Sequence, residues 1–113
     1  MEYRQISEGY SVSGQIEPED VEIIKGAGFE SVICNRPDDE QPGQPSHDAI
    51  KAAAEAAGLS FRFIPVISGQ MTTDNVQDQA KALDEMAGPV LAYCRSGARC
   101  TNLFALVQEM KQG

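Results

Sequence analysis

The feature that most constrains the fold is a repeated alternation of short apolar runs with longer amphipathic segments. Short apolar runs bounded by turn residues are typical of buried strands, and the longer segments carry helix-starting and helix-ending residues. A strand–helix order that repeats along the chain predicts an α/β protein with a largely parallel central sheet. The expected strands are residues 10–13, 31–35, 60–66 and 89–94, and the expected helices are residues 17–28, 46–58, 74–86 and 100–110.

Length and charge limit the classes of protein that remain. The 113 residues suit a single domain, residues 1–113, and a formal net charge of −8 disfavours nucleic acid and anionic membranes as partners. No apolar run approaches the roughly 20 residues needed to cross a bilayer. The N-terminal segment lacks the basic start and apolar stretch of a secretory signal, so we expect a cytoplasmic protein.

The most informative stretch is YCRSGARC, residues 93–100, which ends the most apolar strand. In a parallel sheet this position lies at the carboxyl edge, where the N–H groups of a following helix point toward a bound anion. Because that environment favours a thiolate, we predict that Cys94 has a lowered pKa and is a nucleophile. Gly97 permits a tight turn, and Arg99 offers a planar set of donors to an oxyanion. The rest of the predicted anion-binding loop is Arg95, Ser96, Ala98 and Cys100.

The cysteines also have plainer interpretations. Cys94 alone could be a buried residue at a strand end, but its combination with a glycine, an arginine and a following helix favours a reactive site. Cys34 lies inside an apolar run and is expected in the core. The three cysteines and His47 lack the spacing of a zinc site, and an odd cysteine count argues against a disulfide framework. We therefore expect neither a metal nor an organic cofactor.

Four segments carry a family resemblance: VSGQIEPEDV (12–21), ICNRPDDEQPGQP (33–45), AAAEAAGLSFRFIPV (52–66) and LAYCRSGARCTNLFAL (91–106). They resemble the bacterial family known as the phosphatase-like domain of beta-lactamase-hydrolase-like proteins, over nearly the whole chain. The resemblance implies the fold of dual-specificity tyrosine phosphatases, a four-stranded, mostly parallel sheet flanked by helices. Family members occur alone or fused to a persulfide dioxygenase or a redox flavoprotein, which implies such a partner and a role in sulfide metabolism.

The spacing inside the loop differs from that of tyrosine phosphatases. Those enzymes carry Cys-x5-Arg followed by Ser or Thr, whereas here Arg99 comes one residue early and Cys100 takes the place due for the arginine. The resulting Cys-x4-Arg resembles the rhodanese sulfurtransferases, in which CRSG-x-R is a common active-site string. Because one sulfane sulfur needs a smaller cradle than a phosphoryl group with three oxygens, the spacing favours sulfur transfer.

A phosphatase also needs an acid to protonate its leaving group. The candidates are Asp38 and Asp39, although a solvated, charged loop is the plainer explanation of both, and Thr73 or Asp74 is expected to cap a helix. The resemblance also implies that Arg36 and Asp38 line the mouth of the pocket. Sulfite or a thiolate leaves without protonation, so the lack of a clear acid weighs against phosphate hydrolysis.

Cys100 departs from related loops, which usually carry serine at this position. One interpretation is a small buried substitution at the start of a helix. The other is a resolving thiol that forms a reversible disulfide with Cys94 after oxidation. The sequence leaves both open.

Taken together, these patterns favour a sulfurtransferase in which Cys94 takes sulfur from thiosulfate or a persulfide and passes it to a thiol or cyanide. The backbone N–H groups of residues 95–99 and the Arg99 side chain would hold the negative charge. The alternative is a tyrosine-type or small-phosphoester phosphatase with a Cys94 phosphocysteine and Asp38 or Asp39 as acid. A third hypothesis is a non-catalytic module that binds an anion or docks a partner. The expected ligand is a small anionic sulfur donor or a phosphoester.

Overall fold

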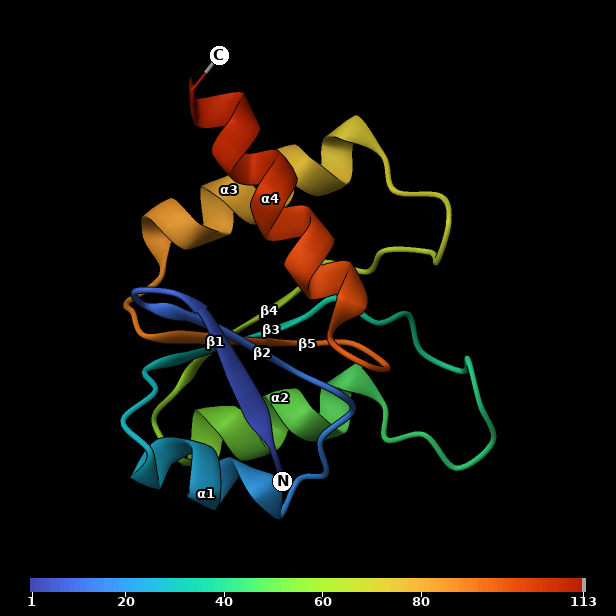
Figure 1. Cartoon of the computed structure of the whole chain (residues 1–113). Helices are drawn as coiled ribbons and strands as arrows, with labels where there is room; N and C mark the ends of the chain where they lie inside the picture. Colours follow the sequence, from blue (N-terminus) through green and yellow to red (C-terminus); the bar gives the residue numbers. More distant parts are fainter. Residues whose placement is uncertain (113) are drawn as a thin grey trace.

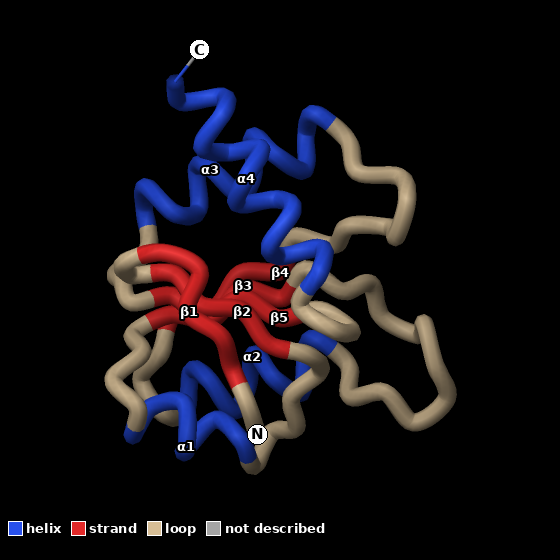
Figure 2. The backbone as a smooth tube through the Cα atoms, viewed as in Figure 1, coloured by secondary structure: helices blue, strands red, loops and turns tan. Residues whose placement is uncertain are grey.

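A computed structural model describes residues 1–112, in which a twisted sheet lies between two pairs of helices (Figures 1 and 2). The strands are β1 (Tyr3–Ser7), β2 (Tyr10–Ser13), β3 (Ser31–Cys34), β4 (Ser60–Phe63) and β5 (Val90–Tyr93). The helices are α1 (Asp20–Gly26), α2 (His47–Ala56), α3 (Thr73–Glu85) and α4 (Ala98–Gln112). The predicted α/β class is confirmed.

The sheet has five strands in the order β1-β2-β5-β3-β4, so the expectation of four strands is wrong. Strands β2, β5, β3 and β4 are parallel, and β1 pairs antiparallel with β2 at the edge. Strand β1 was missed because its residues are exposed or half-buried, and an edge strand of that kind carries no apolar run. It is joined to β2 by a tight turn at Gly9, whose φ of 80° suits glycine.

Each face of the sheet carries its own core. Helices α1 and α2 cover one face, and α3 and α4 cover the other (Figure 2). Successive side chains of β5 alternate between these faces, so Leu91 and Tyr93 pack with the α1 and α2 side while Val90 and Ala92 pack with the other. Cys94 continues this alternation and lies on the face covered by α3 and α4.

Helices α2 and α3 start at side-chain caps. Ser46 caps α2 as predicted, because its hydroxyl accepts the Ala49 N–H at 3.2 Å. Helix α3 is capped by Thr72, not by Thr73 or Asp74: Thr72 accepts the Asn75 N–H at 3.1 Å, and the Asn75 side chain accepts the Thr72 N–H at 2.9 Å. This reciprocal capping box uses asparagine, so a search for Glu or Gln at that position does not find it. Within residues 1–112, none of the helices is long and apolar enough to cross a bilayer.

Candidate active site

The carboxyl ends of three neighbouring parallel strands meet at the Cys94 loop. The Cys94 N–H donates to the Ser13 carbonyl of β2 at 3.3 Å, and the Gln15 N–H donates to the Arg95 carbonyl at 3.3 Å. On the other side of β5, the Asn35 N–H donates to the Tyr93 carbonyl at 2.8 Å. The loop is therefore held on both flanks, at the edge where α/β proteins bind their ligands.

The Cys94 sulfur lies at the base of a ring of N–H groups. The Gly97 N–H donates to Sγ at 3.1 Å. A hydrogen bond from the Cys100 side chain contributes most to lowering the Cys94 pKa to about 5; burial opposes it, and backbone N–H groups of Cys100, Ser96 and Gly97 add to it. The residue is only 1% exposed, so the thiolate is stabilised by the loop and not by bulk water. The low pKa agrees with the thiolate predicted from the sequence, and the reactivity of Cys94 stays a prediction.

Two glycines let the main chain close around this sulfur. Gly97 has a φ of 93°, a conformation that residues with a Cβ rarely adopt. A Cβ on Gly14 would lie 2.9 Å from the Arg95 carbonyl oxygen, so the β2 loop can approach the Cys94 loop only without a side chain there. Gly14 is therefore required by the close packing of backbone on backbone, and Gly97 by its positive φ.

Helix α4 begins at Ala98, two residues before the expected start. Thr101 fixes this first turn because its N–H and its hydroxyl both donate to the Gly97 carbonyl, at 3.0 and 2.9 Å. The Ala98 N–H donates to the Ser96 hydroxyl at 3.4 Å. Arg99 consequently leaves from the first helical turn, where the helix dipole favours negative charge.

A buried polar network supports this turn from below. The Tyr10 hydroxyl donates to the Cys100 carbonyl at 2.9 Å, and the Gln79 amide donates to the Tyr10 oxygen at 3.3 Å. Gln79 also exchanges hydrogen bonds with the Asn35 side chain, at 2.9 and 3.2 Å. This network links α3, β2 and β3 to the first turn of α4, and the sequence analysis did not detect it.

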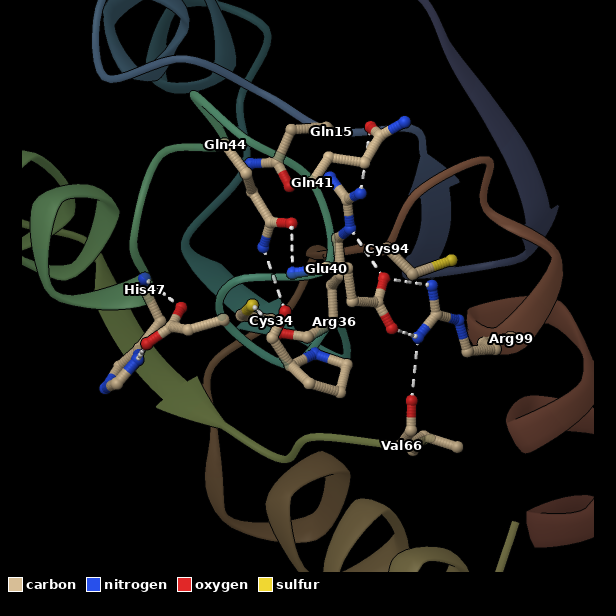
Figure 3. A network of polar contacts seen from close by, with 12 residues as sticks. Gln15, Cys34, Arg36, Glu40, Gln41, Gln44, His47, Val66, Cys94 and Arg99 are labelled. Carbon is tan, nitrogen blue, oxygen red and sulfur yellow. Dashed lines mark hydrogen bonds and ion pairs between the residues drawn. The ribbon is translucent and has the colours of Figure 1, made fainter. Parts of the chain in front are cut away.

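Arg99 binds a carboxylate with one edge of its guanidinium (Figure 3). Nη1 and Nη2 donate to the two oxygens of Glu40 at 2.7 and 2.8 Å, and Nη1 also donates to the Val66 carbonyl at 2.8 Å. Among residues 1–112, Nε–H and the second Nη2–H have no partner. Those two donors form the other edge of the guanidinium, and in Figure 3 the Cys94 sulfur lies on the side away from Val66. Arg99 therefore keeps a two-donor edge for an oxyanion.

Arg36 lies behind this pair. Its Nε donates to Glu40 at 2.8 Å, Nη1 donates to Gln15 at 3.0 Å and Nη2 donates to Gln41 at 3.1 Å. Arg36 is only 2% exposed, so the prediction that it lines the mouth of the pocket is wrong. Arg99 contributes most to lowering the Glu40 pKa to about 2; burial opposes this, and Arg36 adds to it.

The two candidate acids, Asp38 and Asp39, have other positions and contacts. One Asp38 oxygen accepts the His47 N–H at 2.8 Å, and the other lies 2.7 Å from His47 Nδ1. Asp38 therefore holds the start of α2, where His47 also stacks on Phe63 with ring centroids 3.7 Å apart. Asp39 is exposed and adopts a φ of 63° in the turn. Neither carboxyl has a hydrogen bond to Cys94 or Arg99.

The remaining thiols are buried. Burial, followed by the neighbouring Cys94, raises the pKa of Cys100 well above its usual range. Burial also raises the pKa of Cys34, which lies in the α1 and α2 core as predicted. Arg95 is exposed at the tip of the loop. Within residues 1–112, His, Cys, Asp and Glu side chains form no group of three or more that could hold a metal ion.

The family model for the phosphatase-like domain of beta-lactamase hydrolase-like proteins matches residues 2–111. The chain belongs to this family. A beta-lactamase hydrolase-like protein of Xylella fastidiosa (strain Temecula1) is 39% identical over 106 residues, which are 94% of this chain and 25% of that protein. One from Agrobacterium fabrum is 37% identical, over 90% of this chain and 24% of its own length. The chain thus spans about a quarter of the curated relatives that it matches.

Solved structures place the fold among the phosphatases. A phosphatase candidate from Neisseria meningitidis superposes with a TM-score of 0.86 at 34% identity, over 93% of this chain and 75% of that one. The core of the PP-IP phosphatase Siw14 from S. cerevisiae gives a TM-score of 0.72 over 98% and 67% of the two chains, and at 12% identity it shows the fold alone. The implied tyrosine-phosphatase-like fold is confirmed. These matches support a phosphatase-like enzyme, and they give no support to the sulfurtransferase that the sequence favoured.

Proposed function

We propose that this chain is a cysteine-dependent phosphatase that works through a phosphocysteine on Cys94. The observation that carries the proposal is the Cys94 sulfur, held at the base of a ring of N–H groups with a pKa of about 5, beside the free edge of Arg99. A thiolate at neutral pH in a cradle of donors is what attack on a phosphoryl group requires.

In the first step the Cys94 sulfur bonds to phosphorus while the bond to the leaving oxygen breaks, and that oxygen keeps the electron pair. The N–H groups of the loop and the free edge of Arg99 would stabilise the three non-bridging oxygens. In the second step water attacks phosphorus, the sulfur leaves as a thiolate, and inorganic phosphate carries away both protons of the water.

The surroundings also limit the leaving group. Glu40 is the carboxyl in contact with Arg99, and with a pKa of about 2 it is ionised at neutral pH and has no proton to give. Both oxygens of Asp38 are engaged by His47. We therefore propose substrates whose leaving group departs without protonation, such as aryl phosphates or phosphoanhydrides, over alkyl phosphates.

Sulfur transfer through the same thiolate is the second candidate. Two observations favour it: Arg99 follows Cys94 by only five positions, as in the rhodanese string, and a sulfite or thiolate leaving group needs no acid. It would use Cys94 as a persulfide carrier between an anionic donor and a thiol.

One preparation assayed with an aryl phosphate and with thiosulfate plus cyanide distinguishes the two functions. The proposal expects phosphate release that is lost in Cys94→Ser, without thiocyanate formation. Thiocyanate formation without phosphate release would contradict the phosphatase proposal and support sulfur transfer. Activity that survives Cys94→Ser would contradict both.

A further inference from the structure

A single carboxylate joins two arginines beside Cys94, and the proposed mechanism assigns it no task. Glu40 Oε1 accepts from Arg36 Nε and from Arg99 Nη2, both at 2.8 Å, while Oε2 accepts from Arg99 Nη1 at 2.7 Å. All these hydrogen bonds are charge-assisted, which makes them shorter and stronger than neutral ones. The arrangement is visible in the centre of Figure 3.

These contacts fix the orientation of the Arg99 guanidinium. Glu40 takes one N–H from each Nη atom, and the Val66 carbonyl takes the other Nη1–H. The Val66 N–H in turn donates to the Asn35 carbonyl at 3.1 Å, so this acceptor is tied to the end of β3. With three of its donors held, a planar guanidinium has one orientation left for its remaining edge.

Arg36 fixes Glu40 in the same way from behind. Its side chain is almost fully buried, and it reaches Gln15 after β2 and Gln41 beyond β3 as well as Glu40. A buried guanidinium with donors committed in three directions has little rotational freedom. The Glu40 side chain, still 24% exposed, gains a rigid partner by binding it.

We propose that Glu40 is a positioning residue that holds the free edge of Arg99 toward the anion bound above Cys94, and that Arg36 holds Glu40. This inference rests on the proposed function only in taking the anion to be a phosphoryl group. Glu40 acts through Arg99 and does not touch the substrate. The low Glu40 pKa agrees with a carboxylate that stays ionised throughout the working pH range.

The opposite role, a carboxylate that competes with the substrate for Arg99, makes the opposite prediction. If Glu40 occupied the substrate's place, its removal would free donors and tighten anion binding. The free Nε–H and Nη2–H edge favours positioning, because the substrate can bind while Glu40 stays in place.

The test compares Glu40→Gln with Glu85→Gln in the full chain. Glu85 is a matched control, since it pairs with Arg62 at 2.6 Å on the surface and has no hydrogen bond to the Cys94 loop. Three quantities are measured for each variant: the Kd for inorganic phosphate, kcat/KM for an aryl phosphate, and the pH midpoint of Cys94 alkylation. Arg36→Met repeats the test one step further from the anion.

The glutamine loses the acceptor for Arg99 Nη1, and misplacement of a catalytic group costs about 10- to 100-fold. We expect the phosphate Kd to rise and kcat/KM to fall by at least about 10-fold in Glu40→Gln, with a smaller change in Arg36→Met and none in Glu85→Gln. The alkylation midpoint should stay at about 5, because the groups that contribute most to lowering the Cys94 pKa are hydrogen-bond donors of Cys100, Ser96 and Gly97, and Glu40 is not among them.

Each contrary result has a distinct meaning. Phosphate binding that is unchanged or tighter in Glu40→Gln overturns the positioning role. An alkylation midpoint that moves toward that of a free thiol also overturns it, because Glu40 would then maintain the loop itself. If the native chain binds phosphate but hydrolyses no phosphate ester, the proposed function fails, while weaker phosphate binding in Glu40→Gln still supports this inference.

Discussion

Two loops at the same edge of the sheet build the site in different ways. The Cys94 loop, residues 94–98, acts through its main chain: N–H groups surround the sulfur, and glycines allow the backbones to approach. The loop of residues 36–46 acts through side chains, with Glu40 and Arg36 meeting groups from other strands. Main-chain geometry is set by local sequence, whereas side-chain pairing depends on the fold, and this difference decides what the sequence can reveal.

Glycine substitutions should give the largest difference in effect on activity between the two loops. In Gly14→Ala the new Cβ would meet the Arg95 carbonyl oxygen at 2.9 Å, so the Cys94 loop has to shift, and we expect kcat/KM to fall by about 100-fold. Gly43→Ala lies in the other loop at a φ of 79° with no atom near the new Cβ. It should cost about 1 kcal/mol of unfolding free energy with little loss of activity.

Chemical denaturation and steady-state kinetics on the two variants provide the measurement. Equal activity losses in both would contradict a site built on close backbone contact in the Cys94 loop alone. Gly26→Ala, at the end of α1 with nothing within 4 Å of the added Cβ, controls for substitution itself.

Cys100 should have an intermediate effect, through a side-chain hydrogen bond to Cys94. Its hydrogen bond is the largest cause of the low Cys94 pKa, so Cys100→Ala should raise that pKa, while Cys100→Ser, which keeps a hydrogen-bonding group, should change it less. The pH dependence of alkylation in the two variants measures this difference. If both variants keep the alkylation midpoint of the native chain, Cys100 does not lower the Cys94 pKa.

The same contact leads us to expect a disulfide between Cys94 and Cys100 after oxidation. Peroxide would convert the Cys94 thiolate to a sulfenic acid, and attack by the Cys100 sulfur would then release water. Peptide mapping after mild peroxide treatment should find this link, and Cys100→Ser should give over-oxidised Cys94 in its place. Over-oxidised Cys94 alone in the native chain would leave Cys100 as a small buried residue of the loop.

The sequence was sufficient for the parallel strands and the Cys94 loop because both depend on local patterns. Four apolar runs mark the strands β2 to β5, and one short motif holds the nucleophile, the glycine and the arginine. Strand β1 was not predicted because its side chains are exposed or half-buried at the edge of the sheet. The pairing of Glu40 with Arg99 was not predicted because the two residues are 59 positions apart in the sequence. A charged turn has the same sequence pattern whether its carboxylates are solvated or paired.

Arg36 is a second residue whose side-chain partners could not be predicted from the sequence. The family resemblance, together with the position of Arg36 at a strand end, implied a residue at the rim of the pocket. The fold brings Gln15, Glu40 and Gln41 around it, and these partners satisfy the buried charge. Loop spacing also did not decide between phosphate and sulfur chemistry, because the Cys-x4-Arg spacing still places Arg99 in the first turn of α4, directly after the Cys94 loop.

The most direct test is the rate of Cys94 alkylation by iodoacetamide as a function of pH, resolved by peptide mass spectrometry. A lowered pKa means that the thiolate is present at all pH values above it and is protonated only in acid. The account predicts a rate that is constant through neutral pH and falls with a midpoint at about 5, together with a parallel loss of phosphatase activity. A midpoint near the roughly 8.5 of an unperturbed thiol would contradict it.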